Sequence, residues 1–419
     1  MTSYDVLIAG AGPAGCAAAY DLARAGKRVL LLDKRTFPRH KACACGLTRK
    51  TLKALRYSVE PIVERVCHEI VLQQAASNAS QRALRVRTRN PICAMAVRER
   101  FDDFCLQQTL AAGADLRKIE GIVSIRETGS LREAAYLHAG TNGVEIDIAT
   151  AAGIETLSAP FMIGADGSNG QTRRLAEGLR TSGEATAAAL PADPQWYARA
   201  FALEATVPYA ALPATLPGGD SPHDLVFDFA PLPGGYGWLF PKGDHINIGV
   251  GAFAPADEAQ LKSATRTLLA EYAQAKLGVA TLTDSGLAKI TGQYLGMGGF
   301  AYVPRGRVLL AGDAAGLVDS LTGEGIHSAI VSGQAAATAI LASMDTGRRA
   351  NVAEEYAKRL RPLQETLAFS HRAAQAFYKQ PARGFRVMRI PLLRSLVLKT
   401  YSDGLQSAKL LGVLAKIVA

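Results

Sequence analysis

The first 34 residues constrain the fold more than any other stretch of the chain. An apolar run, Tyr4–Ala9, leads into Gly10-Ala11-Gly12-Pro13-Ala14-Gly15. An amphipathic run follows, ends before Gly26, and is succeeded by a second apolar run that ends in Asp33. Strand, glycine turn, helix, strand and acidic residue occur in the order that a dinucleotide-binding βαβ unit requires. The alternative is a tight structural turn that binds nothing.

Each glycine of this turn has a physical role in such a unit. Gly10 permits the tight turn, Gly12 lets a pyrophosphate approach the backbone, and Gly15 allows the helix to pack against the strand. Free N–H groups at the helix start attract phosphates, and Asp33 is placed to accept hydrogen bonds from ribose hydroxyls. The cofactor contacts predicted here are Gly10, Gly12, Pro13, Ala14, Gly15, Asp33 and Lys34.

Charge is unevenly distributed over the 419 residues. The net charge is +10, and residues 345–419 hold fourteen basic against five acidic side chains. A basic, apolar tail fits an anionic membrane surface better than a nucleic-acid groove. We therefore expect no nucleic-acid partner and consider a peripheral membrane contact. A helical cap packed on the body, with a basic outer face, is the alternative.

Neither a signal segment nor an apolar run of roughly 18 residues stands out in the sequence. A cytoplasmic location with reduced cysteines is the expectation, with a peripheral place on the inner face of the membrane as its extension. Nothing in the sequence indicates an oligomeric state.

Short apolar runs and alternating patterns continue along the chain. Residues 68–97 alternate as antiparallel strands do, and Arg98 begins an amphipathic helix that ends near Gly113. Residues 115–158 have the pattern of an antiparallel meander. Helices are expected from about Gly325 to Met344 and over 350–419.

Two further glycine–acid elements follow β-prone runs, Gly164-Ala165-Asp166-Gly167 and Gly312-Asp313. With the first turn and the helix start at Arg98, they resemble the FAD-binding pattern of the para-hydroxybenzoate hydroxylase superfamily. The resemblance implies that Arg98 contacts the diphosphate or adenosine side of the flavin, that Asp166 shapes the turn beside the adenosine, and that Asp313 binds the ribityl chain. The alternatives are a solvated helix-start residue for Arg98 and simple turn residues for the two aspartates.

A second glycine-rich segment, residues 319–327, precedes the helix that begins near Gly325. N–H groups at a helix start suit the pyrimidine edge of a flavin, where the reduced ring carries negative charge. A nucleotide phosphate site is the competing interpretation, but residues 10–15 already supply one. Gly323, Gly325 and Ile326 are therefore added to the predicted cofactor contacts.

A more specific resemblance is to the geranylgeranyl reductase family. Lys41-Ala42-Cys43-Ala44-Cys45-Gly46-Leu47 is similar to its Lys-Pro-Cys-Gly-Gly-Gly-Leu loop, and Tyr236-Gly237-Trp238-Leu239-Phe240-Pro241 resembles its Tyr-x-Trp-x-Phe-Pro box. Ala42, Ala44 and Cys45 stand where that family usually has Pro, Gly and Gly. The resemblance implies a FAD-dependent reductase that saturates C=C bonds of a polyprenyl lipid chain, with NAD(P)H or another reductant as electron donor. Cys45 and Gly46 would then adjoin the cofactor.

Reducing a C=C bond requires a hydride on one carbon, a proton on the other and a dry pocket. Tyr236, Trp238 and Phe240 alternate along a strand and so share one face, which predicts an aromatic wall without titrating groups along the substrate channel. An aromatic core stripe is the alternative. Cys43 is the predicted catalytic residue, as a proton relay or a gate, against an ordinary loop cysteine. No metal site is expected, because the Cys43/Cys45 pair beside His40 lacks a second ligand pair.

The predicted fold class is α/β, with a Rossmann-type FAD-binding domain, a β-rich substrate domain that interrupts it, and a C-terminal helical region. Residues 1–70, 98–180 and 300–345 are assigned to the first, 71–97 and 181–299 to the second, and 346–419 to the third. A flavin monooxygenase or halogenase acting on an aromatic or polyketide-like substrate is the alternative enzyme. A non-catalytic flavin- or lipid-binding protein is the alternative outside catalysis.

Overall fold

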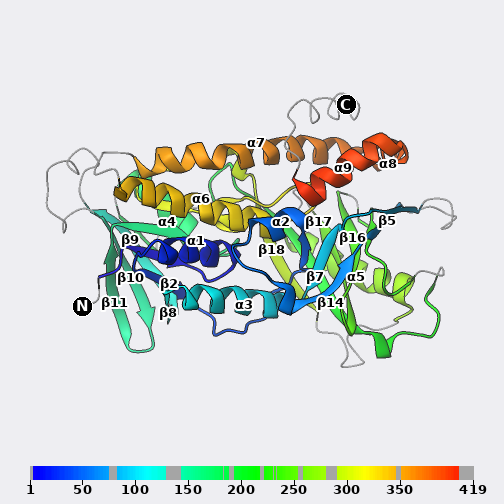
Figure 1. The fold of residues 1–419 in the computed structure, drawn as a ribbon, viewed down its shortest axis with the longest axis horizontal. Coiled ribbons are helices and arrows are strands. Elements are labelled where there is room, and N and C mark those ends of the chain that lie inside the picture. Colours follow the sequence, from blue (N-terminus) through cyan, green and yellow to red (C-terminus); the bar gives the residue numbers. More distant parts are fainter. Residues whose placement is uncertain are drawn as a thin grey trace.

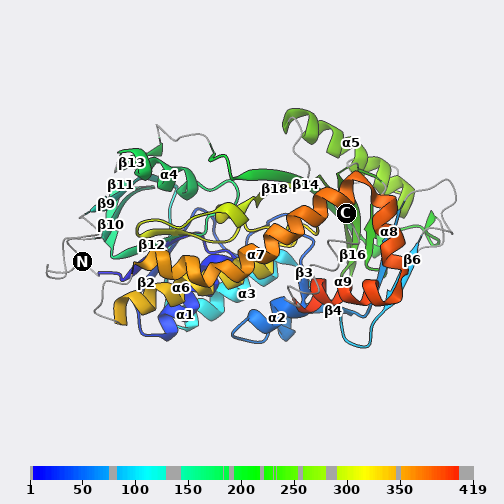
Figure 2. The same cartoon turned by 90° about the horizontal axis from the view of Figure 1, so that it is seen from above.

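The computed structural model describes the backbone of residues 3–74, 83–128, 143–182, 184–187, 193–217, 221–229, 231–232, 234–252, 258–279, 290–345 and 351–404. Within these ranges the molecule has two lobes, with the long helix α7 running over both (Figures 1 and 2).

A five-stranded parallel sheet forms the centre of the first lobe, in the order β19-β12-β1-β2-β8. Four of its strands are almost wholly buried, as expected of apolar strands in a parallel sheet covered on both faces. The Rossmann-type α/β class predicted from the sequence is confirmed. The strands are β1 (Val6–Ala9), β2 (Val29–Asp33), β8 (Asp115–Lys118), β12 (Phe161–Gly164) and β19 (Val308–Leu310).

The expected meander over residues 115–158 is wrong at its start. β8 pairs in parallel with β2 at the edge of the central sheet. It is a short, mostly exposed strand, and its polar composition does not distinguish a parallel edge from a hairpin arm. The meander itself forms a four-stranded antiparallel sheet of β9 (Gly121–Thr128), β10 (Gly143–Thr150), β11 (Gly153–Ala159) and β13 (Glu184–Thr186).

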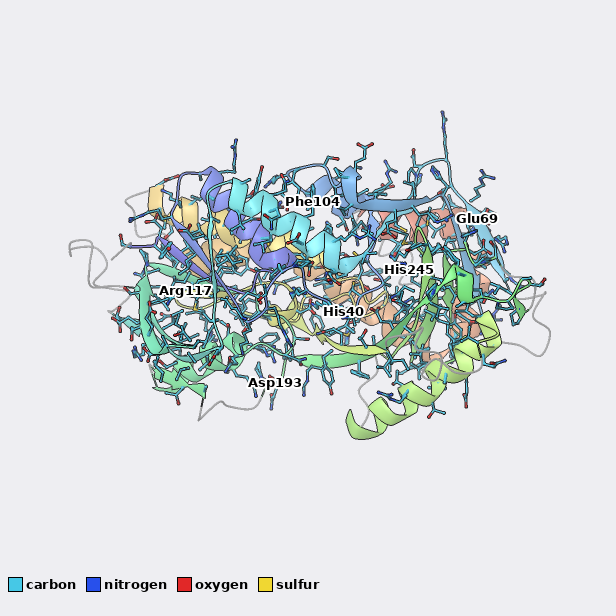
Figure 3. The ribbon with its side chains drawn as sticks, turned by 90° about the horizontal axis from the view of Figure 1, so that it is seen from below. His40, Glu69, Phe104, Arg117, Asp193 and His245 are labelled. Atoms are coloured by element: carbon cyan, nitrogen blue, oxygen red, sulfur yellow. The ribbon has the colours of Figure 1, made fainter. Side chains whose placement is uncertain are left out.

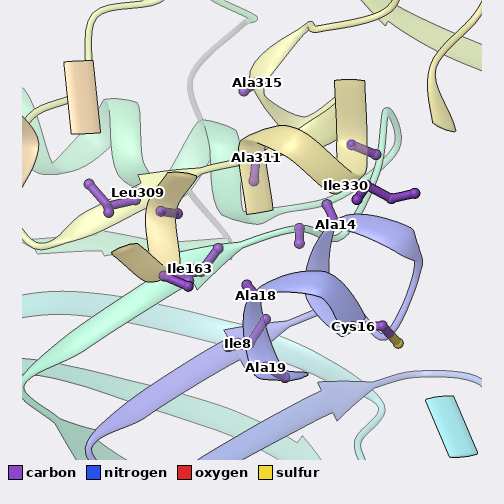
Figure 4. Close-up of a cluster of buried hydrophobic side chains, with 14 of the residues drawn as sticks. Ile8, Ala14, Cys16, Ala18, Ala19, Ile163, Leu309, Ala311, Ala315 and Ile330 are labelled. Atoms are coloured by element: carbon purple, nitrogen blue, oxygen red, sulfur yellow. The ribbon is translucent and has the colours of Figure 1, made fainter. Parts of the chain in front are cut away.

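The two faces of the parallel sheet are covered differently. The meander packs on one face, and helices pack on the other, where α1 contacts both α3 and α6 and α7 lies outside α6. Figure 4 shows the core on the helical side, where Ile8 of β1 lies beside Ala18 and Ala19 of α1, and Ile330 of α6 belongs to the same cluster. The helices of this lobe are α1 (Pro13–Arg24), α3 (Arg98–Ala111), α4 (Thr172–Ser182), α6 (Ile326–Asp345) and α7 (Val352–Lys379).

Helix α6 is the one described helix that is long and apolar enough to cross a membrane, with a mean hydropathy of 1.2. It lies between α1 and α7, and a Cβ at Gly333 would stand 2.2 Å from the carbonyl oxygen of Ala14. Its composition is therefore that of a core helix packed to backbone contact.

The second lobe is built on a seven-stranded sheet, ordered β18-β14-β17-β16-β15-β5-β6. One face packs on helix α5 (Glu258–Leu277), and the other carries aromatic side chains. The antiparallel pairing expected within residues 68–97 is present between β5 and β6. The strands are β5 (Glu69–Gln73), β6 (Leu84–Arg87), β14 (Ala198–Pro208), β15 (Val226–Asp228), β16 (Gly235–Pro241), β17 (His245–Ala252) and β18 (Thr291–Met297).

A small sheet and the C-terminal helices connect the lobes. The small sheet has the order β3-β7-β4, with β3 (Gly46–Thr48), β4 (Val63–Cys67) and β7 (Cys93–Ala96), and α2 (Arg49–Ala54) follows β3. Beyond α7, α8 (Pro381–Arg389) and α9 (Pro391–Asp403) pack over the aromatic face of the large sheet (Figure 2). The helices expected beyond residue 404 lie outside the described residues. Short 3₁₀ helices span Glu60–Ile62, Tyr209–Ala211, Gly299–Ala301 and Gly312–Ala315.

Candidate active site

A cavity of about 700 Å³ lies between the lobes and is lined by both. Its volume is within the range of small-molecule and cofactor sites. Figure 3 shows His40, on the loop that leads to Cys43, in the middle of the molecule between Arg117 and His245. Of the residues predicted from the sequence, the lining includes Gly10, Gly12, Pro13, Ala14, Asp33, Lys34, Cys43, Cys45, Gly46, Arg98, Asp166, Tyr236, Trp238, Phe240, Gly312, Asp313, Gly323, Gly325 and Ile326.

Gly15 is the predicted residue that the lining does not include. A Cβ there would stand 1.9 Å from the carbonyl oxygen of Gly10, so this glycine allows α1 to pack against its own turn. Gly10 itself has φ +97° and lies against the backbone of Ala165. Gly10 and Gly15 thus allow the close backbone contacts of the turn, and both Gly10 and Gly12 line the cavity.

The start of α1 forms an open cradle. Gly12 precedes Pro13 in extended conformation, and a Cβ at Gly12 would meet only the Arg39 guanidinium, 3.6 Å away. At the end of β2, Asp33 accepts hydrogen bonds from the N–H groups of Ala11 at 2.8 Å and Arg35 at 2.8 Å. Helix N–H groups beside open space, with an acidic residue on the adjoining strand, are the donor and acceptor set that FAD requires.

Buried charges lie beside this cradle. Asp102 forms ion pairs with Arg98 at 2.7 Å and with Arg39 at 3.0 Å, and both arginines line the cavity. Arg98 is 7% exposed, so the alternative of a solvated helix-start residue is wrong. Two guanidinium groups against one carboxylate leave a net positive charge, which suits a diphosphate.

Asp166 and Lys34 border the adjoining turn. Asp166 accepts hydrogen bonds from the backbone N–H of Thr172 at 3.0 Å and from its hydroxyl at 2.9 Å, which ties the turn to the start of α4. Burial raises the pKa of Asp166. Lys34 donates to the side-chain oxygen of Gln171 at 2.6 Å, so this turn is also tied to the end of β2.

Glycine segments far apart in sequence meet at the middle of the cavity. Gly312 has φ +60°, and its Cβ would lie 3.2 Å from that of Ala14. A Cβ at Gly325, directly before α6, would lie 3.5 Å from a carboxylate oxygen of Asp313. The three glycine–acid elements and the 319–327 segment therefore surround one space.

The aromatic residues line the end of the cavity in the second lobe. Tyr236 donates its hydroxyl hydrogen to the carbonyl of Thr322, and a Cβ at Gly46 would lie 3.0 Å from the Phe240 ring. Trp238 donates its indole N–H to Asn247 at 2.7 Å. Because β16 places these three aromatic side chains on its cavity face, they contact both the 41–46 loop and the 319–327 segment.

Cys43 and Cys45 lie on the loop between the two ends of the cavity. Cys45 has φ +48°, a conformation that favours glycine, and its N–H donates to the Cys43 sulfur at 3.4 Å. The Cys45 thiol and the positive charge of Arg98 lower the pKa of Cys43 well below the usual value of a thiol. Cys43, the predicted catalytic residue, lines the cavity.

Two buried charged residues at this loop were missed by the sequence reasoning. Glu204 on β14 is 6% exposed and accepts the N–H of Cys43 at 2.8 Å, and Lys242 is 2% exposed and donates to the carbonyl of Ala44 at 2.6 Å. Burial, together with Cys43, raises the pKa of Glu204 to about 7. Burial lowers the pKa of Lys242.

The expectation of a wall without titrating groups is therefore wrong at its border, because Glu204 lines the same cavity as Trp238. A signal was present in the sequence. Glu204 is a lone acidic residue between Phe201-Ala202-Leu203 and Ala205, and a charged residue at the centre of an apolar strand is costly unless it has a role.

Known proteins resemble this chain over most of its length. Residues 3–198 match the model of the FAD binding domain family. The chain is 27% identical to geranylgeranyl diphosphate reductase of Rhodobacter capsulatus, over 83% of this chain and 78% of that protein. It is 30% identical to menaquinone reductase of Mycolicibacterium smegmatis, over 80% of this chain and 76% of that protein.

Solved structures share the whole architecture. A geranylgeranyl bacteriochlorophyll reductase-like protein of Thermoplasma acidophilum aligns with a TM-score of 0.67 at 19% identity, over 99% of this chain and 96% of that one. The flavin-dependent brominase Bmp2 aligns with a TM-score of 0.69 at 16% identity, over 100% and 98% of the two chains. At these identities the likeness concerns the fold alone. Identity to the reductases extends over three quarters or more of their length, and on that basis the chain belongs to the geranylgeranyl reductase family of FAD-dependent oxidoreductases.

Proposed function

We propose that this protein saturates C=C bonds of a polyprenyl lipid chain, with FAD as its redox cofactor. The observation that carries the proposal is that the dinucleotide cradle and the aromatic wall line one cavity. Relatives are named for geranylgeranyl diphosphate and for menaquinone, and both compounds contain polyprenyl chains. The quinone and diphosphate head groups differ, so the shared polyprenyl part is the substrate class that we assign.

Reduced FAD supplies the hydride in this chemistry. The N–H groups at the start of α1, with Arg39 and Arg98, are assigned to the diphosphate, and Asp33 is assigned to the ribose. Gly323–Ile326 at the start of α6 are assigned to the pyrimidine edge, where a helix N-terminus stabilises negative charge. The electron donor that we expect is NAD(P)H or another reductant.

Tyr236, Trp238 and Phe240 are assigned to the polyprenyl chain. All three are 6% exposed, and burial raises the pKa of Tyr236, which stays a hydrogen-bond donor to Thr322. Apolar ring faces bind an alkyl chain through the hydrophobic effect and exclude water from the reacting carbons.

We also propose that the turn between α8 and α9 contacts an anionic membrane surface, through which the lipid chain enters. Tyr401 of α9 lines the cavity, whereas Leu392 and Ile390 at that turn are 77% and 48% exposed. Arg389 and Arg394 flank these two apolar side chains. Apolar residues beside basic ones are the pattern of helices that lie at a lipid interface. The two interpretations of the tail are then compatible. The inner faces of α8 and α9 pack on the body as a helical cap, and their outer side contacts the membrane.

The test of the proposed reaction is reoxidation of the reduced flavoprotein. The FAD-loaded protein is photoreduced without oxygen and mixed with geranylgeranyl diphosphate or a menaquinol, whose ring is already reduced and cannot accept the electrons. Flavin reoxidation with a product heavier by two hydrogens per reduced bond is the expected result. No reoxidation by either compound, combined with a hydroxylated or halogenated aromatic product after oxygen is admitted, would support the monooxygenase or halogenase alternative instead.

A further inference from the structure

We propose that Glu204 is the general acid that gives the second carbon of the alkene its proton, an inference that rests on the proposed reductase function. None of the residues assigned to the cofactor or to the polyprenyl chain supplies that proton. The reaction therefore requires a proton donor at the aromatic end of the cavity. Among the carboxyl groups in the described lining, Glu204 is the one in sheet register with Trp238.

The sheet register places Glu204 in line with the aromatic wall. On neighbouring strands, Glu204 pairs with Gly249, and Gly249 pairs with Trp238. Residues directly opposite one another across strands have side chains on the same face. Glu204, Gly249 and Trp238 thus form one row across β14, β17 and β16, on the face that lines the cavity.

Gly249 has a steric role in this row. A Cβ at Gly249 would stand 2.0 Å from Cζ2 of Trp238, because the indole lies across the glycine. The missing side chain lets Trp238 extend along the row toward Glu204. The carboxyl group and the indole therefore border the same part of the cavity, where an alkyl chain held on the ring has the acid beside it.

Hydrogen bonds hold the carboxyl group in place. Oε1 of Glu204 accepts the N–H of Cys43 at 2.8 Å. Asn247 on β17 accepts the indole N–H of Trp238 through its side-chain oxygen at 2.7 Å. The loop of Cys43 therefore orients the acid, and Asn247 orients the indole of the aromatic wall.

The environment keeps this carboxyl group about half protonated at neutral pH. The titrating groups that act on it are Cys43, from the loop before β3, and Lys242, at the end of β16, while β17 contributes the neutral Asn247. Burial and Cys43 raise the pKa of Glu204 to about 7, with Lys242 acting in the opposite direction. A general acid is most effective when its pKa is near the working pH.

The step balances in atoms and electrons. The O–H bond of Glu204 breaks and a C–H bond forms at one alkene carbon, while the hydride supplied by reduced FAD forms the C–H bond at the other carbon. The alkene gains two electrons, and the flavin loses two. Glu204 is left as a carboxylate and recovers a proton from solvent before the next turnover.

The test compares Glu204→Gln with Glu69→Gln, the same change in the same sheet but outside the cavity lining. Glutamine keeps the acceptor for the Cys43 N–H but has no acidic proton. Reoxidation of the photoreduced flavin by geranylgeranyl diphosphate or a menaquinol, in which only C=C bonds can be reduced, should slow by about 100-fold or more in Glu204→Gln. Glu69→Gln should match the wild type.

A spectroscopic measurement supports the kinetic one. In the wild type and in Glu69→Gln, the infrared band of a protonated carboxyl group should titrate with a midpoint of about 7, and Glu204→Gln should lack it. If Glu204→Gln does not retain FAD, Glu204→Asp replaces it, with the band kept and the reoxidation rate reduced. A band with a midpoint of about 7 that persists in Glu204→Gln, or wild-type reoxidation in that variant, overturns the proton donor alone. Failure of the wild type to be reoxidised removes the proposed function, and the proton donor with it.

Discussion

The two ends of the cavity are built in contrasting ways. The dinucleotide end depends on backbone N–H groups and glycines of a contiguous βαβ unit, to which distant glycine turns are added. The aromatic end is assembled from side chains on β14, β15 and β16, and the 41–46 loop and α9 complete its lining. Backbone recognition tolerates little variation in the turn, whereas a wall of side chains can change its specificity without altering the fold. Binding of FAD and selection of the lipid should therefore be separable by mutation.

The largest effect on FAD binding alone is expected from a substitution of Gly12. Its backbone is extended, with φ −80°, and open space lies above it, so Gly12→Val should fold but place a side chain where the diphosphate approaches. We expect FAD affinity to fall by about 100-fold or more, since the phosphate loses its helix N–H contacts. Flavin fluorescence titration measures the loss. Ala25→Val, at the other end of α1, is the control, and unchanged FAD affinity in Gly12→Val would contradict the cradle.

The aromatic end should show a pH-dependent stability that comes from Glu204. The folded protein holds the Glu204 proton up to about pH 7, whereas the reference pKa is 4.5. The free energy of unfolding therefore falls as the pH rises between these values, by roughly 3 kcal/mol for this group. Denaturant titrations at pH 4.5 and pH 8 should show the loss in the wild type relative to Glu204→Gln. Parallel pH profiles in the two proteins would contradict it.

A substitution in the aromatic wall should affect the lipid and leave the cofactor bound. We expect Trp238→Leu to lower kcat/KM for a polyprenyl substrate by about 10- to 100-fold, because part of the ring surface against the chain is lost. FAD affinity should stay unchanged. Leu239→Val, on the opposite face of β16, is the control and should reduce stability by about 1 kcal/mol without selective loss of activity. An equal loss of FAD affinity in Trp238→Leu would mean that the two ends are not separable.

The proposed membrane contact can be tested by comparing exposed leucines on the two lobes. Leu392→Glu should weaken binding to phosphatidylglycerol vesicles about 10-fold, since it removes buried apolar area and adds a repelled charge. Leu116→Glu is the matched control, because Leu116 is also exposed but lies on β8 of the first lobe. Vesicle sedimentation at low and high salt measures both. Equal loss in the two variants, or none, would place the contact elsewhere.

The smallest effect is expected on the loop between the ends. Cys45→Gly should change stability by no more than about 1 kcal/mol, because relief of the left-handed backbone offsets the added freedom of the unfolded chain. It should raise the pKa of Cys43, because the Cys45 thiol is the main cause of its lowering. The measurement is the pH dependence of Cys43 alkylation, with Cys45 and with Cys45→Gly. Both proteins have serine in place of Cys16, Cys67, Cys93 and Cys105. An unshifted profile would leave Arg98 as the main influence.

The sequence alone determined the dinucleotide unit, the α/β class and the segments that meet at the cofactor end. These features are local, since a βαβ unit carries its strand, glycine turn and acidic residue within 34 residues. Period-2 alternation also predicted correctly that Tyr236, Trp238 and Phe240 share a face of one strand.

Only the tertiary structure decided which residues stand beside that face. Glu204, Gly249 and Trp238 form a row because three strands pair in a particular register, and register depends on contacts between residues far apart in the chain. The same holds for β8, whose short polar pattern is equally compatible with a hairpin and with a parallel edge, and for α9, which brings Tyr401 to the cavity. The local sequence pattern determines on which face of a strand a side chain lies. The packing of the whole chain determines which residues lie opposite it.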